Sequence, residues 1–394
     1  MAFHRRQQSL EMVLDFTPTF QLPMNQYDTA TVIFQQLIDH YGLESSLAQR
    51  RYKPAKLIQA LFDNMAAKHS FLRFFFTFIH EYSGQEADVG PDLGRPLSYF
   101  HDFLEWSPDR KRDLNEAIEA FATYIVDDFL LPLRASSAKT PQPTPSSLSS
   151  IQASTPTGTL GRVSGLRRTC LKRDQHRCVI SNSFDLKEAD KRYEQEGDNY
   201  RDDAGNFLRD EPSENFAFLE VAHILPHCLT TVSTGDADLS DSKKIVLQIL
   251  DMFDPGIIHL IDGPAMDSPR NALTLTNHYH QLFGQFQIHF EATGRRDEYK
   301  IDLTRRRPHL RQGNFPIIRK LSESPDGTID LPSPRLLAVH RSIACIMHLS
   351  GAGEYINGIL RDLEEVNVKA DGSTNLEFLM NLSLGGWLNT MTVY

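Results

Sequence analysis

The chain has 394 residues, of which 40% are hydrophobic and 23% are charged, and its formal net charge is −10 at pH 7. This composition indicates a folded protein with two or three domains and excludes a chain that is disordered throughout. The negative charge argues against strong, non-specific binding of the whole chain to nucleic acid, because such binding requires cations that displace phosphate counterions. Four cysteines in a chain of this length are too few and too scattered for a disulfide framework.

Residues 1–134 are predicted to form a helical domain whose role the sequence does not reveal. Apolar residues recur at helical spacing within 33–41 and 57–65, and a longer apolar stripe covers 114–129. Ser107 stands directly before a proline, which predicts the cap and first turn of the third of these helices.

Neither a signal sequence nor a membrane span is predicted. The first residues lead into polar sequence, and the most apolar run, at 71–79, is too short to cross a bilayer. We therefore expect an intracellular protein without membrane contact, in either the nucleus or the cytoplasm.

Serine, threonine and proline dominate much of residues 135–164. Such a composition buries too little apolar area to offset the entropy lost when a chain is ordered. We expect a flexible linker over this range.

Residues 165–332 mix short β-like runs with turns and form the next predicted domain. A strand is expected within 216–225, and alternating apolar residues on both sides of Gly294 predict a hairpin. Two helices are expected in the C-terminal segment, 333–394, and the sequence leaves open which domain they pack against.

Three polar residues of the 165–332 region occur in an order that suits phosphodiester hydrolysis. His223 closes a strand-like run, Asn271 lies in a turn before alternating apolar residues, and His280 follows nine positions later on a short predicted helix. A histidine near its ordinary pKa can deprotonate water at neutral pH. A divalent cation can stabilise the charge that develops on the phosphorus centre and on the leaving oxygen.

This ordered set resembles the HNH nuclease family, whose ββα-metal site consists of a strand histidine, a loop asparagine and a helix histidine. The resemblance continues over 282–301, where the sequence is similar to fungal HNH nuclease domain-containing proteins. It implies an α+β fold, with a ββα-metal HNH-like domain, a separate N-terminal all-helical domain and C-terminal helices. It also implies a metal-dependent endonuclease that hydrolyses phosphodiester bonds, with nucleic acid, and DNA in particular, as its partner.

By this resemblance, His223, Asn271 and His280 are the catalytic residues, and His223 is the general base. His280 is also a metal ligand, whereas Asn271 either holds the loop or ligates the metal through its amide oxygen. Many members of the family have another ligand directly before the base, but this chain has Ala222 there. We therefore take Glu220, on the same face of the strand, as a further candidate ligand.

Other polar residues near the motif are weaker candidates. Asp267 is a possible contributor, and His227 and His278 are expected to be bystanders. Carboxylate and amide oxygens favour Mg²⁺ or Mn²⁺, whereas two imidazoles would shift the preference to Zn²⁺ or Ni²⁺.

Cations flank the motif on both sides in two clusters. The first comprises Arg162, Arg167, Arg168, Lys172, Arg173 and Arg177, and the second comprises Arg295, Arg296, Lys300, Arg305, Arg306, Arg307 and Arg311. We predict that Arg270, Arg173 and Arg177 contact nucleic acid, although each cluster is equally compatible with solvated surface charge. The alternative function is a catalytically weak or inactive HNH-fold module that binds nucleic acid or protein, which Ala222 and the acidic net charge favour.

Overall fold

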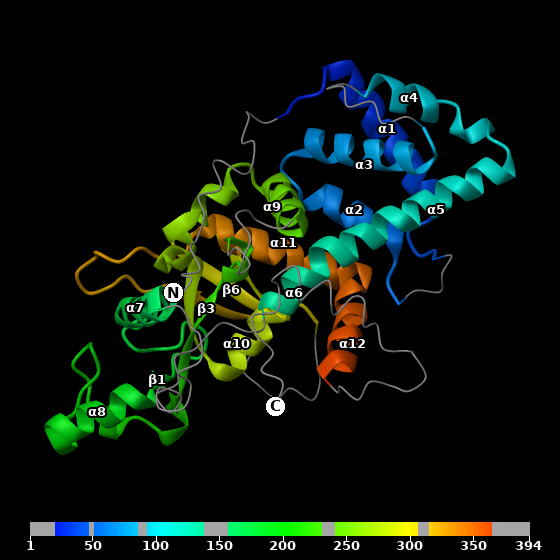
Figure 1. Ribbon diagram of the computed structural model, residues 1–394. Helices are drawn as coiled ribbons and strands as arrows, with labels where there is room; N and C mark the ends of the chain where they lie inside the picture. The colour runs from blue at the N-terminus through cyan, green and yellow to red at the C-terminus, as the bar shows by residue number, and fades with distance from the viewer. Residues whose placement is uncertain are drawn as a thin grey trace.

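The computed structural model describes residues 20–46, 51–85, 93–137, 157–230, 241–305 and 315–364. Helices make up most of these ranges, and three small sheets lie among them (Figure 1). This mixture of helices and strands agrees with the predicted α+β class. None of the helices in the described ranges combines the length and the apolar content that crossing a bilayer requires.

The helices expected in the N-terminal region are present. They are α1 (Met24–Tyr41), α2 (Pro54–Asn64), α3 (Lys68–Tyr82), α4 (Gly94–Phe100), α5 (Pro108–Ile125) and α6 (Leu131–Ser137), with a π-helical turn over Val126–Leu130 between the last two. The Ser107 hydroxyl accepts a hydrogen bond from the backbone N–H of Arg110, which confirms the predicted cap of α5. Aromatic rings fill the core of this region, where Phe34, Phe75 and Phe121 meet edge to face.

One hydrophobic cluster joins these helices to the rest of the described residues. It runs from Leu22 to Ile356 without a break between the N-terminal and C-terminal parts. The backbone N–H groups of Ala66 and Ala67 also donate to carbonyls at the end of α9 (Asp241–Phe253). The N-terminal helices therefore share their core with the remainder of the protein.

Both ends of the predicted linker, 135–164, are helical. Helix α6 ends at Ser137 and helix α7 spans Thr157–Arg173, whereas residues 138–156 lie outside the residues that the structure describes. In α7, Leu166 and Cys170 pack against the strands of the central hairpin. This tertiary packing overrides the poor helix propensity of the glycine, serine and threonine residues around them.

A hairpin followed directly by a helix forms the centre of the region around the motif. Strand β3 (Leu219–His223) pairs antiparallel with β4 (Ala272–Thr276), and His223 lies opposite Ala272. Helix α10 (Asn277–Gly284) begins immediately after β4, where the Thr276 hydroxyl accepts from the N–H of Tyr279.

Two further sheets and several short helical turns surround this ββα unit. Strand β1 (Phe184–Asp185) pairs parallel with β2 (Phe216–Ala217), and β5 (Ile288–Ala292), β6 (Glu298–Leu303) and β7 (Ile317–Lys320) form an antiparallel sheet in that order. The pairing of β5 with β6 confirms the predicted hairpin. Helix α8 (Leu186–Glu196) follows β1 in the sequence and precedes β2, and it projects at one end of the molecule (Figure 1).

The C-terminal helices pack against the N-terminal helices and against the sheet that contains β5. Helix α11 (Pro334–Ser350) contacts α2 as well as β5, and α12 (Ala352–Glu364) follows it (Figure 1). The imidazole of His340 on α11 lies between the rings of Phe283 and Phe286, stacked on Phe283 at 3.9 Å between ring centroids. It also lies 3.1 Å from the carbonyl of Phe283, so α11 fixes the end of α10.

Candidate active site

The ββα unit contains all three residues of the sequence motif. His223 is the last residue of β3, and His280 lies in the first half of α10. Asn271 ends a short 3₁₀ turn (Pro269–Asn271) and directly precedes β4. Each of the three side chains is buried or nearly so.

Asn271 connects the two loops that meet beside the hairpin. Its Oδ1 accepts the backbone N–H of Leu225 at 2.9 Å, and its Nδ2 donates to the carbonyls of Leu225 and Met266 at 3.1 Å each. The side chain is 0% exposed. Both polar atoms are thus engaged with backbone groups, as expected of a residue that holds a loop.

His223 and Asp267 form a buried pair. The Nε2 of His223 lies 3.3 Å from Oδ1 of Asp267, which ends the 3₁₀ turn Gly263–Asp267. Because that carboxylate oxygen can only accept, a neutral His223 carries its proton on Nε2 and has its lone pair on Nδ1. The Nδ1 atom is buried and makes no hydrogen bond with any described residue.

His227 shares the same carboxylate, although the sequence predicted a bystander. Its Nε2 lies 3.5 Å from Oδ1 of Asp267, and its ring centroid is 5.8 Å from that of His223. Asp267 is the functional candidate that the sequence marked least clearly. Its position four residues before Asn271 places it near the motif in sequence, but its partner His223 is 44 positions away.

The electrostatics of this group favour an unprotonated His223 at neutral pH. Burial lowers the pKa of His223, the hydrogen bond to Asp267 raises it, and the charges of His227 and His280 lower it again, with a net decrease. For Asp267, burial opposes ionisation, but hydrogen bonds to His223 and His227 hold its pKa well below the usual range of a carboxyl group. The effect of His280 on His223 also indicates that the two imidazoles of the motif are close enough to interact electrostatically.

Glu220 and His280 form a second polar pair across β3 and α10. The Nδ1 of His280 lies 2.6 Å from Oε2 of Glu220, and Asn277 donates to the other carboxylate oxygen at 3.0 Å. The hydrogen bond from His280 is the largest cause of a lowered pKa at Glu220. Ala222, by contrast, is buried and offers no ligand atom.

A carboxylate beside an imidazole is a chemically suitable pair of donors for a divalent cation. Mg²⁺ commonly takes one or two protein carboxylates and completes its coordination with water and substrate phosphate. Glu220 and His280 therefore fit as two ligands of such an ion. Within the described ranges, no group of three or more histidine, cysteine or carboxylate side chains is arranged to hold a metal.

Arg173 is buried, which corrects the prediction that it contacts nucleic acid. Its side chain is 0% exposed, and it forms a two-pronged ion pair with Asp174. Its remaining donors bind the carbonyls of Pro269 at 2.7 Å and Ala272 at 3.0 Å. The guanidinium thus holds both ends of the turn that contains Asn271, and in this position it cannot reach a phosphate.

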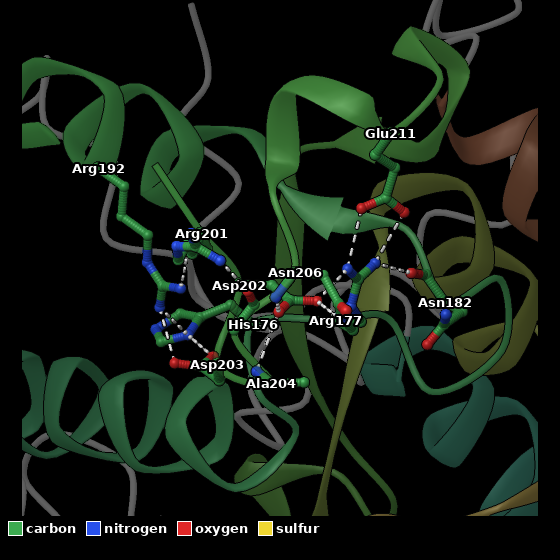
Figure 2. A network of polar contacts seen from close by, with 11 residues as sticks. His176, Arg177, Asn182, Arg192, Arg201, Asp202, Asp203, Ala204, Asn206 and Glu211 are labelled. Atoms are coloured by element: carbon green, nitrogen blue, oxygen red, sulfur yellow. Dashed lines mark hydrogen bonds and ion pairs between the residues drawn. The ribbon is translucent and has the colours of Figure 1, made fainter. Parts of the chain in front are cut away.

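Arg177 is neutralised by two carboxylates. Figure 2 shows its guanidinium between Glu211, which it binds through both nitrogens at 2.9 and 3.0 Å, and Asp202 at 3.1 Å. In the same network, Arg192 and His176 meet at Asp203. These contacts hold the polar segment between β1 and β2 in place. They also pair the guanidinium of Arg177, which we predicted to contact nucleic acid, with carboxylates of the protein.

Most other cations of the two clusters are also paired. Arg167, Lys172, Arg295, Arg296, Lys300 and Arg305 each form an ion pair with a carboxylate. Arg306, Arg307 and Arg311 lie outside the described residues, as does the side chain of Arg162. Arg270 is exposed beside Asn271, and its side chain forms no ion pair within the described part of the chain.

Comparison with protein families matches residues 178–291 to the family described as HNH endonuclease. The matched segment contains both polar pairs and Asn271, whereas α7 and α11 lie outside it. No curated protein and no solved structure matched the chain.

Proposed function

We propose that the protein, whose residues 178–291 match the HNH endonuclease family, is a metal-dependent endonuclease that hydrolyses phosphodiester bonds in DNA. The observation that carries this proposal is that one strand, β3, contributes His223 to the pair with Asp267 and Glu220 to the pair with His280. Together they provide the two functions that the reaction needs, namely a base for water and donors for a cation.

His223 is the general base in this proposal. Asp267 accepts from Nε2 and thereby orients the ring, so that Nδ1 can take the proton of the attacking water. Once His223 is protonated, the negative charge of Asp267 stabilises the imidazolium. The lowered pKa of His223 keeps its base form populated at neutral pH.

Glu220 and His280 would hold the divalent cation, with Mg²⁺ or Mn²⁺ preferred to Zn²⁺ or Ni²⁺. When bound, the cation supplies positive charge to the crowded phosphorus centre and to the leaving 3′ oxygen. Asn271 contributes by holding the loops around His223, and its hydrogen bonds to backbone groups support this role over metal ligation.

Arg270 is the cation proposed to contact the phosphate backbone. It lies on the turn between Asp267 and β4, and its carbonyl accepts from the N–H of Ser333, which anchors the turn to the start of α11. An exposed guanidinium on an anchored turn suits a phosphate contact that positions the substrate.

A plasmid-nicking assay on the full chain tests the proposal. The purified protein is assayed with Mg²⁺, Mn²⁺ or Zn²⁺, beside the variants His223→Ala and His101→Ala. His101 is an exposed histidine of the N-terminal region, so its variant controls for the loss of an imidazole. We expect cleavage by the parent and by His101→Ala, and a loss of about 100-fold or more in His223→Ala.

Two outcomes would contradict the proposal. Cleavage by His223→Ala at the parent rate would remove His223 from the base role. A folded parent protein that binds DNA but cleaves it with none of the three metals would instead support the inactive binding module, which Ala222 favours.

A further inference from the structure

Asp267 faces two histidines at once. One oxygen, Oδ1, lies 3.3 Å from Nε2 of His223 and 3.5 Å from Nε2 of His227. The Nδ1 atoms of both rings and the Oδ2 atom of Asp267 are buried and make no hydrogen bond with a described residue. His227 begins the 3₁₀ turn His227–Thr230, so the turn after β3 brings it back to the carboxylate that serves His223.

We propose that His227 is a positioning residue for His223, because both imidazoles lie against the same oxygen of the Asp267 carboxylate, so that a positive charge on one ring opposes a positive charge on the other. The inference rests on the proposed function, in which His223 is the base. In this inference, His227 determines the pH range over which His223 is able to accept a proton.

The charges of Asp267 and the two histidines couple the protonation of the two rings. Asp267 carries one negative charge, which one protonated imidazole balances. A second proton would place two cations within contact distance in a buried site, where like charges repel strongly. Protonation of His227 therefore disfavours protonation of His223, in agreement with the contribution of His227 to the lowered pKa of His223.

The other charges near this turn come from the elements packed against it. The turn His227–Thr230 contacts the turn Gly263–Asp267, and it also contacts α9. On α9, the buried Lys243 acts electrostatically on Cys228, the neighbour of His227. His280 of α10 acts on His223. A positive charge on His280 therefore adds to the repulsion that keeps His223 unprotonated.

Two substitutions of His227 separate its charge from its hydrogen bond. In His227→Gln, the amide can still donate to Asp267 but cannot gain a proton. In His227→Phe, both the donor and the charge are lost. In both variants the side chain at position 227 can no longer carry a positive charge, and we expect the acid limb of the pH–rate profile to move upward by roughly 0.5 to 1 pH unit. His227→Phe should in addition lower the plateau rate, because Asp267 loses one of its two partners.

A titration of the His223 ring tests the inference without relying on catalysis. The Cε1–H signal of His223 is followed by NMR in the full-length parent, in His227→Gln and in the control His101→Gln. We expect the midpoint for His223 to rise in His227→Gln and to stay unchanged in His101→Gln. An unchanged midpoint in His227→Gln would overturn the inference, even where His223→Ala proves inactive and the proposed function stands.

Discussion

Asn271 binds both backbone polar groups of Leu225, accepting from its N–H at 2.9 Å and donating to its carbonyl at 3.1 Å. Leu225 lies two residues after His223, and the same amide donates to the carbonyl of Met266, the neighbour of Asp267. One buried side chain thus connects the segment after the proposed base to the segment that contains its carboxylate partner. The asparagine of the motif therefore fixes the distance between the members of the His223–Asp267 pair.

The first prediction concerns the stability contributed by Asn271. Replacement by alanine leaves three buried backbone groups without their partner, so Asn271→Ala should lower the free energy of unfolding by about 1–3 kcal/mol or more. Asn271→Asp should cost more, because a carboxylate would face the carbonyls of Leu225 and Met266. Urea unfolding of the variants measures both effects. Equal stability of Asn271→Ala and the parent would contradict the loop-holding role.

The second prediction concerns metal binding by Glu220. Glu220→Gln removes the negative charge beside His280, so the affinity for Mn²⁺ should fall by about 10- to 100-fold. Isothermal titration calorimetry of the full chain measures this change without any assay of cleavage. Glu105→Gln, an exposed carboxylate in the N-terminal region, is the matched control and should bind Mn²⁺ as the parent does. An unchanged affinity in Glu220→Gln would exclude Glu220 as a ligand.

The third prediction concerns the pH dependence of stability at His340. Burial lowers the pKa of His340 to about 3 from 6.5. Between these values the unfolded chain binds a proton that the folded chain does not. This contribution to stability is therefore complete above pH 6.5 and is lost as the pH falls toward 3, by at most about 1.4 kcal/mol per pH unit.

Replacing His340 by phenylalanine isolates this contribution. The free energy of unfolding of the parent and of His340→Phe is measured between pH 7 and pH 5. The phenylalanine ring can occupy the space between Phe283 and Phe286 but has no proton to gain. Its stability should therefore fall less steeply with acidification, whereas parallel curves would show that His340 is not a buried neutral histidine.

The fourth prediction separates two arginines close to the motif. Arg270→Ala should weaken binding to duplex DNA and reduce the slope of log affinity against log salt by about 0.9, as expected for one phosphate contact. Arg173→Met should instead destabilise the fold by about 3–5 kcal/mol, because it leaves Asp174 as a buried, unpaired charge. Fluorescence anisotropy at several salt concentrations and thermal unfolding distinguish the two. A salt slope unchanged by Arg270→Ala would contradict the phosphate contact.

The sequence predicted the strand, turn and helix that carry the motif residues better than it predicted the contacts between residues that are distant in the sequence. The apolar pattern before His223, the turn at Asn271 and the short helix with His280 each depend on neighbouring residues, and all are present in the fold. The sharing of Asp267 by His223 and His227 depends on how two loops meet, and periodicity carries no information about that. The burial of Arg173 could not be predicted for the same reason. Its position in a basic cluster of the sequence does not indicate that Asp174 and two backbone carbonyls surround its guanidinium.

Composition was also a poor guide where tertiary packing determines the local structure. Residues 157–164 belong to helix α7 despite a linker-like composition, because Leu166 and Cys170 further along that helix pack on the central hairpin. The position of α11 was left open by the sequence, since an apolar helical face fits any complementary surface. In the fold it packs on α2 and on β5, and His340 connects it to α10.

Chemical rescue of His223→Ala tests the central claim most directly. The variant is assayed for plasmid cleavage with Mg²⁺ or Mn²⁺ alone, with added imidazole, and with added pyrazole, a ring of similar shape that is a much weaker base. If His223 is the general base, the variant is nearly inactive, imidazole restores part of the rate and pyrazole does not. Cleavage by the variant at the parent rate without any added base would contradict the account.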